Sequence, residues 1–421
     1  MLSSTASLYA FLSLSSALTI TTRGNAGYYY MPVEFDYDPD SRVTAELTFG
    51  SADKEPIQVV MDTGSSDAWI WSPNGTIHWG SNYLGAVGPC NASVPTPYNP
   101  SLSSTAIVYD HNSTYAYAGN AKIVSGAQYV NDTLTATNGS PIPNVQIAME
   151  NYGTLRQLDD GSCKIPEFDR GIIGLAPYTN TTSGPAFRQN LFDAGLIATR
   201  TMTMWFDHTT TSLSKLVGGV IFGGIDTSKY TGELIQVPNV IADYQIGIYI
   251  PKPNVTINGQ TFVPDQNTTC LLDSGAHADY IPFDYLSNMT SQFLAASNGT
   301  LIQYAGVIGF NGSCENIPSD LNITYTFPGV EEGKSVSIDV PIKNYARGLQ
   351  TPPDADMGDI CLFNLESGGC QFGAPFLSGA FMGLDDEGAE IWLAQGAVSA
   401  EGQGVSGSLK VFEAGEGFGS L

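Results

Sequence analysis

The sequence predicts an all-β protein, and three observations support that prediction. Glycine and proline are abundant, at 46 and 24 of 421 residues, and with many threonines, valines and tyrosines they favour strands and turns over helices. Short apolar runs recur roughly every 8–12 residues between turn-forming residues, a spacing typical of all-β chains. Helical periodicity is confined to short segments such as 185–196 and 283–298.

The expected strands follow one another along the whole chain. Each is a short run of apolar and β-branched residues that ends at a turn residue. They include RVTAELTFG (42–50), AIVYD (106–110), QYVNDTL (128–134), NVQIAME (144–150), KLVGGVIFGG (215–224), IGIYI (246–250) and NVTING (254–259). No low-complexity linker separates two halves of the chain.

A four-residue motif nevertheless occurs twice. DTGS (62–65) returns as DSGA (273–276), and each copy follows a run of apolar residues. Each copy is also followed by an apolar residue and a glycine: Gly174 lies 112 residues after the first aspartate, and Gly373 lies 100 residues after the second. A single Asp-Thr-Gly is ordinary turn chemistry, whereas the repeated context predicts two halves built on one plan.

The repeat gives the first aspartate a partner. If the halves pair about a pseudo-twofold axis, Asp62 faces Asp273, and two carboxylates that close share a proton over part of the pH range. One form is an acid and the other a base, so a water held between them is activated for attack on a carbonyl. This chemistry suits peptide hydrolysis in acid. The residues that would let the loops approach and brace each other are Thr63, Gly64, Ser274 and Gly275.

The charge of the chain excludes some partners. It carries 16 Lys+Arg against 41 Asp+Glu, a formal net charge of -25. This excess of negative charge argues against binding to nucleic acid or to an anionic membrane surface. It fits a protein that works in acid, where many carboxylates are protonated and repel each other less. The alternative is that the charge only keeps the protein soluble.

The N-terminus predicts export. Residues 1–26 form an expected signal peptide, with an apolar core at 8–20 and a small-residue cleavage pattern at 15–17 or 24–26. No other segment approaches the ~18 uninterrupted apolar residues of a membrane span, and the C-terminus has no hydrophobic tail that a lipid anchor would replace. We therefore expect a secreted, extracellular protein without a membrane anchor.

Glycosylation signals agree with this location. The chain has twelve Asn-x-Ser/Thr sequons, and so many in one chain indicate an oxidising compartment. They lie at Asn74, Asn91, Asn112, Asn131, Asn138, Asn180, Asn254, Asn267, Asn288, Asn298, Asn311 and Asn322.

The six cysteines then form three expected disulfides, although spacing alone allows fifteen pairings. No C-x2-C pair is present and the four histidines are scattered, so we expect neither a metal site nor a cofactor.

At this point the chain resembles the pepsin-like aspartic endopeptidases, and within them the secreted fungal branch. The resemblance covers roughly residues 30–410. Besides the two aspartate loops, the matching segments are FDRGIIGLAP (168–177), VIFGGIDTSKYTGELIQVP (220–238) and QFGAPFLSGAFMGLDDEGAEIWLAQ (371–395). The resemblance implies a bilobal pepsin-like fold, with two pseudo-twofold-related β-lobes and an active cleft between them. The expected organisation is a signal peptide (1–26), an N-terminal lobe (27–230), a C-terminal lobe (231–412) and a tail (413–421).

The resemblance also implies disulfide pairs. Cys314–Cys361 matches the bridge of the family's second lobe. Cys270 and Cys370 each lie three residues before a motif residue, on strands that should be neighbours, so we expect them to pair. This leaves Cys90–Cys163 for the first lobe.

Further site residues follow from the resemblance. Ser65 matches the serine that hydrogen-bonds the first catalytic aspartate, and Trp69 matches the tryptophan behind the flap, a hairpin that closes over substrate. Tyr117 is the expected flap tyrosine, because Ala118-Gly119-Asn120 after it can form the tip; Tyr115 is the second candidate. Tyr117 and Trp69 should exchange a hydrogen bond. The alternative is that both tyrosines simply pack in strands.

The second loop departs from the family pattern. Ala276 replaces a hydroxyl residue that would bond Asp273, and one fewer bond to the ionised form should raise the pKa of that aspartate. We therefore expect a higher pH optimum than in relatives with threonine. His277 contacts either substrate or only solvent. The segment QFG (371–373) replaces an apolar-Leu-Gly sequence, and the flap carries an apparent insertion at 120–124.

The front end also departs from the family. Only about 26 residues precede YYYMPVEFDYDP (28–39), with one basic residue and no dibasic site. The sequence thus predicts either folding without a conventional pro-segment or a chain whose start is missing.

Two other functions remain as alternatives. One is a catalytically impaired pepsin-like binding or inhibitor protein; the other, resting only on the sequons, is an adhesive glycoprotein. No G-x-S-x-G or H-E-x-x-H motif is present, and the G-x-G-x-x-G match at 402–407 has no following helix. The preferred interpretation is an endopeptidase that acts on polypeptide substrates, binds statine-type inhibitors and is a monomer.

Overall fold

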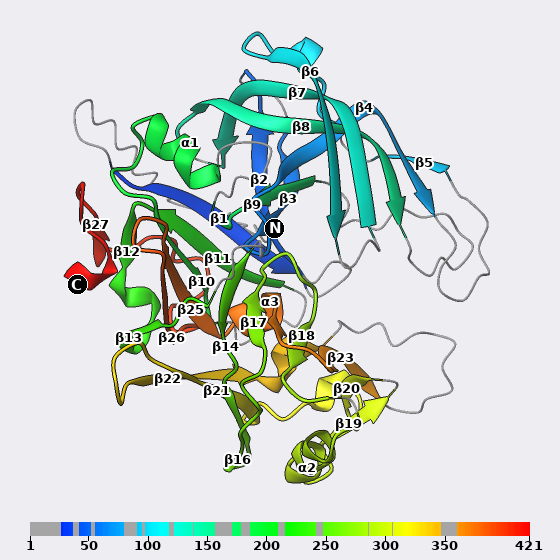
Figure 1. Ribbon diagram of the computed structural model, residues 1–421, viewed down its shortest axis with the longest axis vertical. Coiled ribbons are helices and arrows are strands. Elements are labelled where there is room, and N and C mark those ends of the chain that lie inside the picture. Colours follow the sequence, from blue (N-terminus) through cyan, green and yellow to red (C-terminus); the bar gives the residue numbers. More distant parts are fainter. Residues whose placement is uncertain are drawn as a thin grey trace, which may run out of the picture.

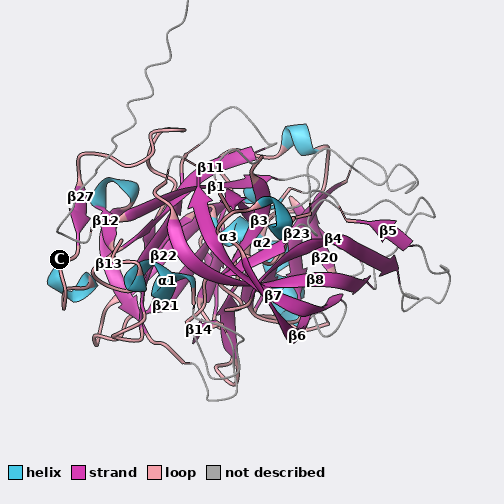
Figure 2. Ribbon diagram, turned by 90° about the horizontal axis from the view of Figure 1, so that it is seen from above, coloured by secondary structure: helices cyan, strands magenta, loops and turns pink. Residues whose placement is uncertain are grey.

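The computed structural model of the chain describes residues 27–36, 42–51, 55–79, 91–94, 97–117, 122–137, 139–155, 171–177, 186–208, 215–240, 247–284, 286–304, 306–346 and 360–421. Strands make up most of this chain, as the sequence predicts (Figure 2). The three α-helices of the described residues are short: α1 (Phe187–Asp193), α2 (Asn288–Ala296) and α3 (Ala374–Leu377). The first two confirm the helical periodicity read from the sequence, whereas α3 was not predicted.

One large sheet runs through the first half and into the end of the chain (Figure 1). Its fourteen strands are β1 (Tyr29–Asp36), β2 (Val43–Phe49), β3 (Ile57–Asp62), β4 (Ala68–Trp79), β5 (Asn91–Ser93), β6 (Ile107–Tyr117), β7 (Lys122–Ala136), β8 (Ile142–Leu155), β9 (Gly171–Gly174), β10 (Thr201–Phe206), β11 (Lys215–Phe222), β13 (Thr231–Val237), β25 (Ala380–Asp385) and β26 (Glu390–Gln395). Because β25 and β26 join β10 and β13, this sheet connects the two halves of the molecule.

The second half has two sheets of its own. The seven-stranded sheet contains β14 (Ile248–Pro251), β17 (Thr269–Leu272), β18 (Asp279–Ile281), β19 (Leu301–Tyr304), β20 (Val307–Phe310), β23 (Cys361–Ser367) and β24 (Gln371–Phe372). The four-stranded sheet contains β15 (Asn254–Ile257), β16 (Gln260–Phe262), β21 (Asn322–Pro328) and β22 (Ser335–Pro341). A further pair joins β12 (Gly224–Asp226) to β27 (Leu409–Val411).

The two halves share one strand plan, as the repeated motif predicts. In the first half, β3 pairs in parallel with β9, β9 pairs antiparallel with β4, and β4 pairs in parallel with β8. In the second half, the same relations hold for β17 with β24, β24 with β18, and β18 with β23. The structure thus has the all-β, bilobal pepsin-like architecture expected from the sequence.

Alternating burial explains why these segments form strands. Along β1, every second residue is buried, and β21 and β22 show the same period in the second half. Buried side chains from both halves, such as Met31, Leu134 and Phe372, belong to one continuous apolar core. Trp69 and Trp71 form a separate cluster beneath β6 and β7. The C-terminal residues, expected as a tail, pack Phe418 against Trp392.

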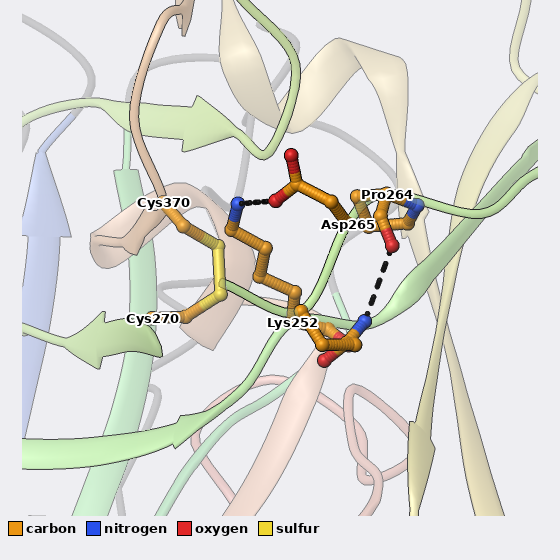
Figure 3. Close-up of a disulfide and its surroundings, with 6 residues drawn as sticks. Lys252, Pro264, Asp265, Cys270 and Cys370 are labelled. Carbon is orange, nitrogen blue, oxygen red and sulfur yellow. Dashed lines mark hydrogen bonds and ion pairs between the residues drawn. A yellow bond between two sulfur atoms is a disulfide. The ribbon is translucent and has the colours of Figure 1, made fainter. Parts of the chain in front are cut away.

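Two predicted disulfides are present. Cys314–Cys361 and Cys270–Cys370 both form, and the second joins β17 to the residue before β24. Figure 3 shows this bridge with the Lys252–Asp265 ion pair beside it. The remaining predicted pair, Cys90–Cys163, lies outside the described residues.

Several other predictions also lie outside the described residues. They concern the signal peptide (1–26), the flap tip (118–120) and the sequons at Asn138 and Asn180. The domain boundaries given above stay predictions. Within the described residues, no helix is long and apolar enough to cross a membrane.

Candidate active site

The two motif aspartates face each other. Asp62 ends β3 and is 4% exposed, and Asp273 follows directly after β17. Each loop's glycine lies against the carboxyl group of the other loop. A Cβ on Gly64 would be 2.5 Å from Cγ of Asp273, and a Cβ on Gly275 would be 2.5 Å from Oδ1 of Asp62. Only glycine therefore permits the close approach that the sequence implied.

Two hydroxyl groups brace the loops in a reciprocal way. The Thr63 hydroxyl accepts a hydrogen bond from the Ser274 backbone N–H at 2.9 Å and donates to the Leu272 carbonyl at 3.0 Å. The Ser274 hydroxyl accepts from the Thr63 N–H at 3.0 Å and donates to the Met61 carbonyl. Serine thus retains the bracing function of threonine in the second loop.

Each aspartate has two hydrogen-bond donors from outside the pair, but their sources differ. Oδ1 of Asp62 accepts from the Gly64 N–H at 2.8 Å, and Oδ2 accepts from the Ser65 hydroxyl at 2.6 Å. Oδ1 of Asp273 likewise accepts from the Gly275 N–H at 3.0 Å. Its Oδ2, however, accepts from the side-chain amide Nε2 of Gln371 at 3.3 Å.

Electrostatics favour one shared proton at this pair. Burial raises the pKa of Asp273 well above its usual range, and the charge of Asp62 and a hydrogen bond with Asp62 raise it further. The Gly275 N–H and the charge of Arg42 oppose these effects. The carboxyl of Asp273 therefore keeps its proton beside Asp62, which is the state in which one group is an acid and the other a base.

The predicted flap contact is also present. β6 and β7 form a hairpin, and the Trp69 indole N–H donates to the Tyr117 hydroxyl at 2.8 Å. This confirms the expected hydrogen bond. The second candidate, Tyr115, instead shares a hydrogen bond of 2.8 Å with Tyr129, so Tyr117 alone of the two meets Trp69 in this way. The ammonium of Lys122 lies 5.0 Å from the Trp69 ring centroid.

The structure adds Asp67 to the site. Its Oδ2 accepts from the Tyr117 hydroxyl at 3.5 Å. Burial and the nearby charge of Asp62 raise the pKa of Asp67 to about 6. Asp67 thus lies between the aspartate pair and the flap tyrosine.

The sequence did not predict three residues that contribute to this site. No function was assigned to Asp67 or Arg42, and Gln371 was noted only as part of the segment that replaces an apolar-Leu-Gly sequence. Each acts through tertiary proximity, for which a single sequence carries no local signal. Of the remaining predicted residues, His277 is exposed and Ala276 is half-buried beside Gly275.

The comparisons with known proteins agree with this geometry. The family model described as eukaryotic aspartyl protease matches residues 43–396. The probable aspartic-type endopeptidase opsB of Aspergillus oryzae is 26% identical over 371 residues, which is 83% of this chain and 67% of that protein.

Two further relatives are similar over long segments. Candidapepsin-3 of Candida albicans is 26% identical over 89% of this chain and 84% of its own length. Pepsin-3 of Oryctolagus cuniculus is 27% identical over 65% of this chain and 62% of its own. A second opsB protein, from Aspergillus fumigatus, matches over 66% of its length, so the chain spans about two thirds of the opsB proteins. Because the family model covers most of its residues, the chain belongs to the eukaryotic aspartyl protease family, a family of aspartic endopeptidases.

Proposed function

We propose that this protein is a secreted aspartic endopeptidase that hydrolyses polypeptides in acid with a water activated by Asp62 and Asp273. The observation that carries the proposal is the facing pair itself. Each carboxyl group lies against the glycine of the opposite loop, and the two are hydrogen-bonded to each other. Such a pair holds one proton and one negative charge in the same small volume.

The reaction uses both protonation states. The ionised carboxylate, which we assign to Asp62, takes a proton from the water as its oxygen attacks the peptide carbonyl carbon. The protonated carboxyl of Asp273 gives its proton to the carbonyl oxygen, which leaves a neutral tetrahedral diol. Asp62 then gives the proton that it took from the water to the amide nitrogen, and Asp273 takes a proton from one hydroxyl of the diol. The C–N bond breaks, an acid and an amine are released, and the pair returns to its starting protonation state. No covalent bond to the protein forms at any step.

Substrate would lie between this pair and the flap. We expect Tyr117, whose hydroxyl is hydrogen-bonded to Trp69 and Asp67, to cover a bound peptide. We expect extended peptides with apolar residues around the cut, since such sites combine apolar pockets with a few fixed polar groups.

Two observations, the names of related proteins and the exposure of several sequons, support secretion. Related proteins of Candida albicans are described as secreted aspartic proteases. The asparagines of six sequons are exposed, which suits glycan addition; they are Asn74, Asn112, Asn267, Asn288, Asn298 and Asn311.

A direct assay tests the proposal. Cleavage of an acid-denatured protein should be measured between about pH 3 and pH 7, with and without a statine-type inhibitor. The wild type should cleave only toward acid, the inhibitor should block cleavage, and Asp62→Asn should abolish it while leaving the melting temperature in acid nearly unchanged. Gln303→Leu, in the second lobe away from the pair, is the control and should retain activity.

The same assay decides against the binding-protein alternative. A wild type that binds the inhibitor with a folded melting curve but cleaves nothing at any pH would overturn the proposed activity and favour an impaired binding protein.

A further inference from the structure

The second aspartate lacks a donor that the first one has. In the first loop, Ser65 follows Asp62 by three residues and donates its hydroxyl to Oδ2 at 2.6 Å. The matching residue after Asp273 is Ala276, which has no hydroxyl. Oδ2 of Asp273 is nevertheless hydrogen-bonded, by Nε2 of Gln371 at 3.3 Å. The same oxygen of each carboxyl group therefore has a donor, but the donors come from different strands.

The sheet register explains why Gln371 reaches this oxygen. β24 lies parallel to β17, with Gln371 opposite Leu271. Side chains two residues apart on a strand share a face, so Leu271, Asp273 and Gln371 project to the same side. A glutamine side chain is long enough to extend from this position toward the carboxyl group.

The first lobe has no such donor at the matching position. There β9 lies parallel to β3, with Ile172 opposite Val60, two residues before Asp62. Isoleucine has no polar group, and Ser65 supplies the donor instead. The two lobes thus carry the opposite combinations: serine with isoleucine in the first, and alanine with glutamine in the second.

We propose that Gln371 is a positioning residue for the reaction, which orients Asp273 and supplies the hydrogen bond that Ala276 does not. This inference rests on the proposed function. A carboxylate only accepts hydrogen bonds, so the amide must present its NH₂ group to Oδ2. That donation favours the ionised form of Asp273 and fixes the rotation of its carboxyl group.

A disulfide and backbone hydrogen bonds hold β24, the strand that carries Gln371, in place. The Cys270–Cys370 disulfide joins the residues next to Leu271 and Gln371. The Asp273 N–H donates to the Phe372 carbonyl at 2.8 Å, and Gln371 also pairs with Tyr280 of β18. Because the backbone on both sides of Gln371 is bonded, its side chain starts from a fixed point.

Other titratable and charged groups around Asp273 also affect its ionisation. Asp62 faces it from β3, and Arg42, just before β2, contributes a favourable positive charge. On β18, Asp279 accepts from the Gly373 N–H at 2.6 Å, and burial raises the pKa of Asp279 well above its usual range, so it is neutral in acid. His277, four residues beyond Asp273, is exposed.

A reciprocal exchange of residues between the lobes tests the proposal. Gln371→Ile places the first-lobe residue in the second lobe and removes the donor, and Gln371→Met is a second variant that keeps the length without branching. Ala276→Ser restores the first-lobe hydroxyl. The double variant Gln371→Ile/Ala276→Ser rebuilds the first-lobe combination, and Gln303→Leu, whose amide donates to Ser367, is the matched control.

The pH dependence of kcat/KM is the main measurement. The basic limb reports the second ionisation of the aspartate pair. Loss of a donor to the ionised form should move this limb upward by roughly 0.5–1 pH unit in Gln371→Ile and Gln371→Met. The double variant should return to within about 0.3 unit of the wild type, and Gln303→Leu should not move. The pH dependence of statine-inhibitor affinity should shift in the same direction.

The outcomes separate the two proposals. An active wild type whose basic limb stays in place in both Gln371 variants overturns the role of Gln371, as does a shift that Ala276→Ser fails to reverse. A wild type without acid proteolysis overturns the proposed function instead. In that case the pH dependence of inhibitor binding still tests whether Gln371 acts on Asp273.

Discussion

The two aspartate loops reach nearly the same geometry with different residues. Threonine and serine brace the loops in the same reciprocal pattern, and both glycines touch the opposite carboxyl group. The supporting strands are fixed differently. The first is held by Arg188, which donates to the Leu175 carbonyl just after β9 at 2.6 Å, and the second by the Cys270–Cys370 disulfide. The comparison shows that the two loops share their hydrogen-bond pattern, while different interactions support them.

The strongest test of this shared geometry is to enlarge either glycine. Gly64→Ala and Gly275→Ala each place a methyl group 2.5 Å from atoms of the opposite carboxyl group, which forces the pair apart. Because a displacement of about 1 Å can cost roughly 100-fold in rate, both variants should lose at least that much kcat/KM. Gly407→Ala, where a Cβ meets nothing within 4 Å, is the control. A tenfold difference between the two loop variants would break the symmetry argued here.

Although Arg188 and the Cys270–Cys370 disulfide differ in chemistry, their removal should lower the free energy of unfolding by similar amounts. Arg188 is 1% exposed and forms two hydrogen bonds with Asp386, whose side chain is 13% exposed. Arg188→Met leaves this carboxylate without its partner and should lower the free energy of unfolding by about 3 kcal/mol. Cys270→Ala/Cys370→Ala should cost about 2–5 kcal/mol. Denaturant unfolding measures both.

A surface pair provides the control for the arginine. Arg200 and Glu387 lie 3.5 Å apart with side chains 35% and 41% exposed, so Arg200→Met should cost about 1 kcal/mol, less than Arg188→Met. An equal loss in Arg200→Met and Arg188→Met would contradict the assigned role of the buried pair.

Each lobe also contains a buried carboxyl group, away from the pair, whose pKa is raised. In the first, Glu150 is fully buried and accepts from the Ser113 hydroxyl at 2.6 Å, and burial raises its pKa to about 7. In the second, Asp279 is buried with a raised pKa. A raised folded-state pKa means that the folded protein binds more protons, so stability is greatest in acid and falls as pH rises.

Replacing the buried carboxyl group with an amide should remove the fall in stability as pH rises. Glu150→Gln should flatten the fall in stability between about pH 4.5 and pH 7, worth about 3 kcal/mol above that range. Melting temperatures at matched pH values measure this difference, with little change expected at pH 4. Asp279→Asn should act in the same sense in the second lobe. If Glu150→Gln lowers stability equally at all pH values, burial of a neutral acid is the wrong explanation.

The smallest expected effects concern the bracing hydroxyls. Thr63→Val leaves the Ser274 N–H and the Leu272 carbonyl without their partner, and Ser274→Ala does the same to the Thr63 N–H and the Met61 carbonyl. Each should cost about 1–3 kcal/mol of unfolding free energy. Because the bonds are reciprocal, the two losses should agree within about 0.5 kcal/mol. A larger gap would show that one loop carries more of the bracing.

Much of this arrangement could be predicted from the sequence, because it depends on short motifs that can be recognised in a single chain. The two aspartate motifs and their downstream glycines are short segments with strong chemical character, and the Trp69–Tyr117 bond follows from the resemblance to the aspartic endopeptidases. The pairing of Cys270 with Cys370 followed from their equal distance to motif residues. These predictions do not require the register of the strands to be known.

The rest depends on contacts between distant segments. The sequence identified the loss of a hydroxyl at Ala276 and predicted its effect on Asp273. It gave no sign that Gln371 would offset the loss, because that contact spans 98 residues and requires the parallel register of β24 on β17. The sequence gave no sign of the role of Asp67 for the same reason, because its contact with Tyr117 of β6 spans 50 residues.

The continuous sheet has a consequence for how the chain is made. β10 pairs on one side with β11, which follows it closely, but its other neighbour is β25, about 180 residues later. During synthesis the edge of β10 stays open until β25 has left the ribosome. Exposed edges recruit other strands, so fragments that end before β25 should aggregate.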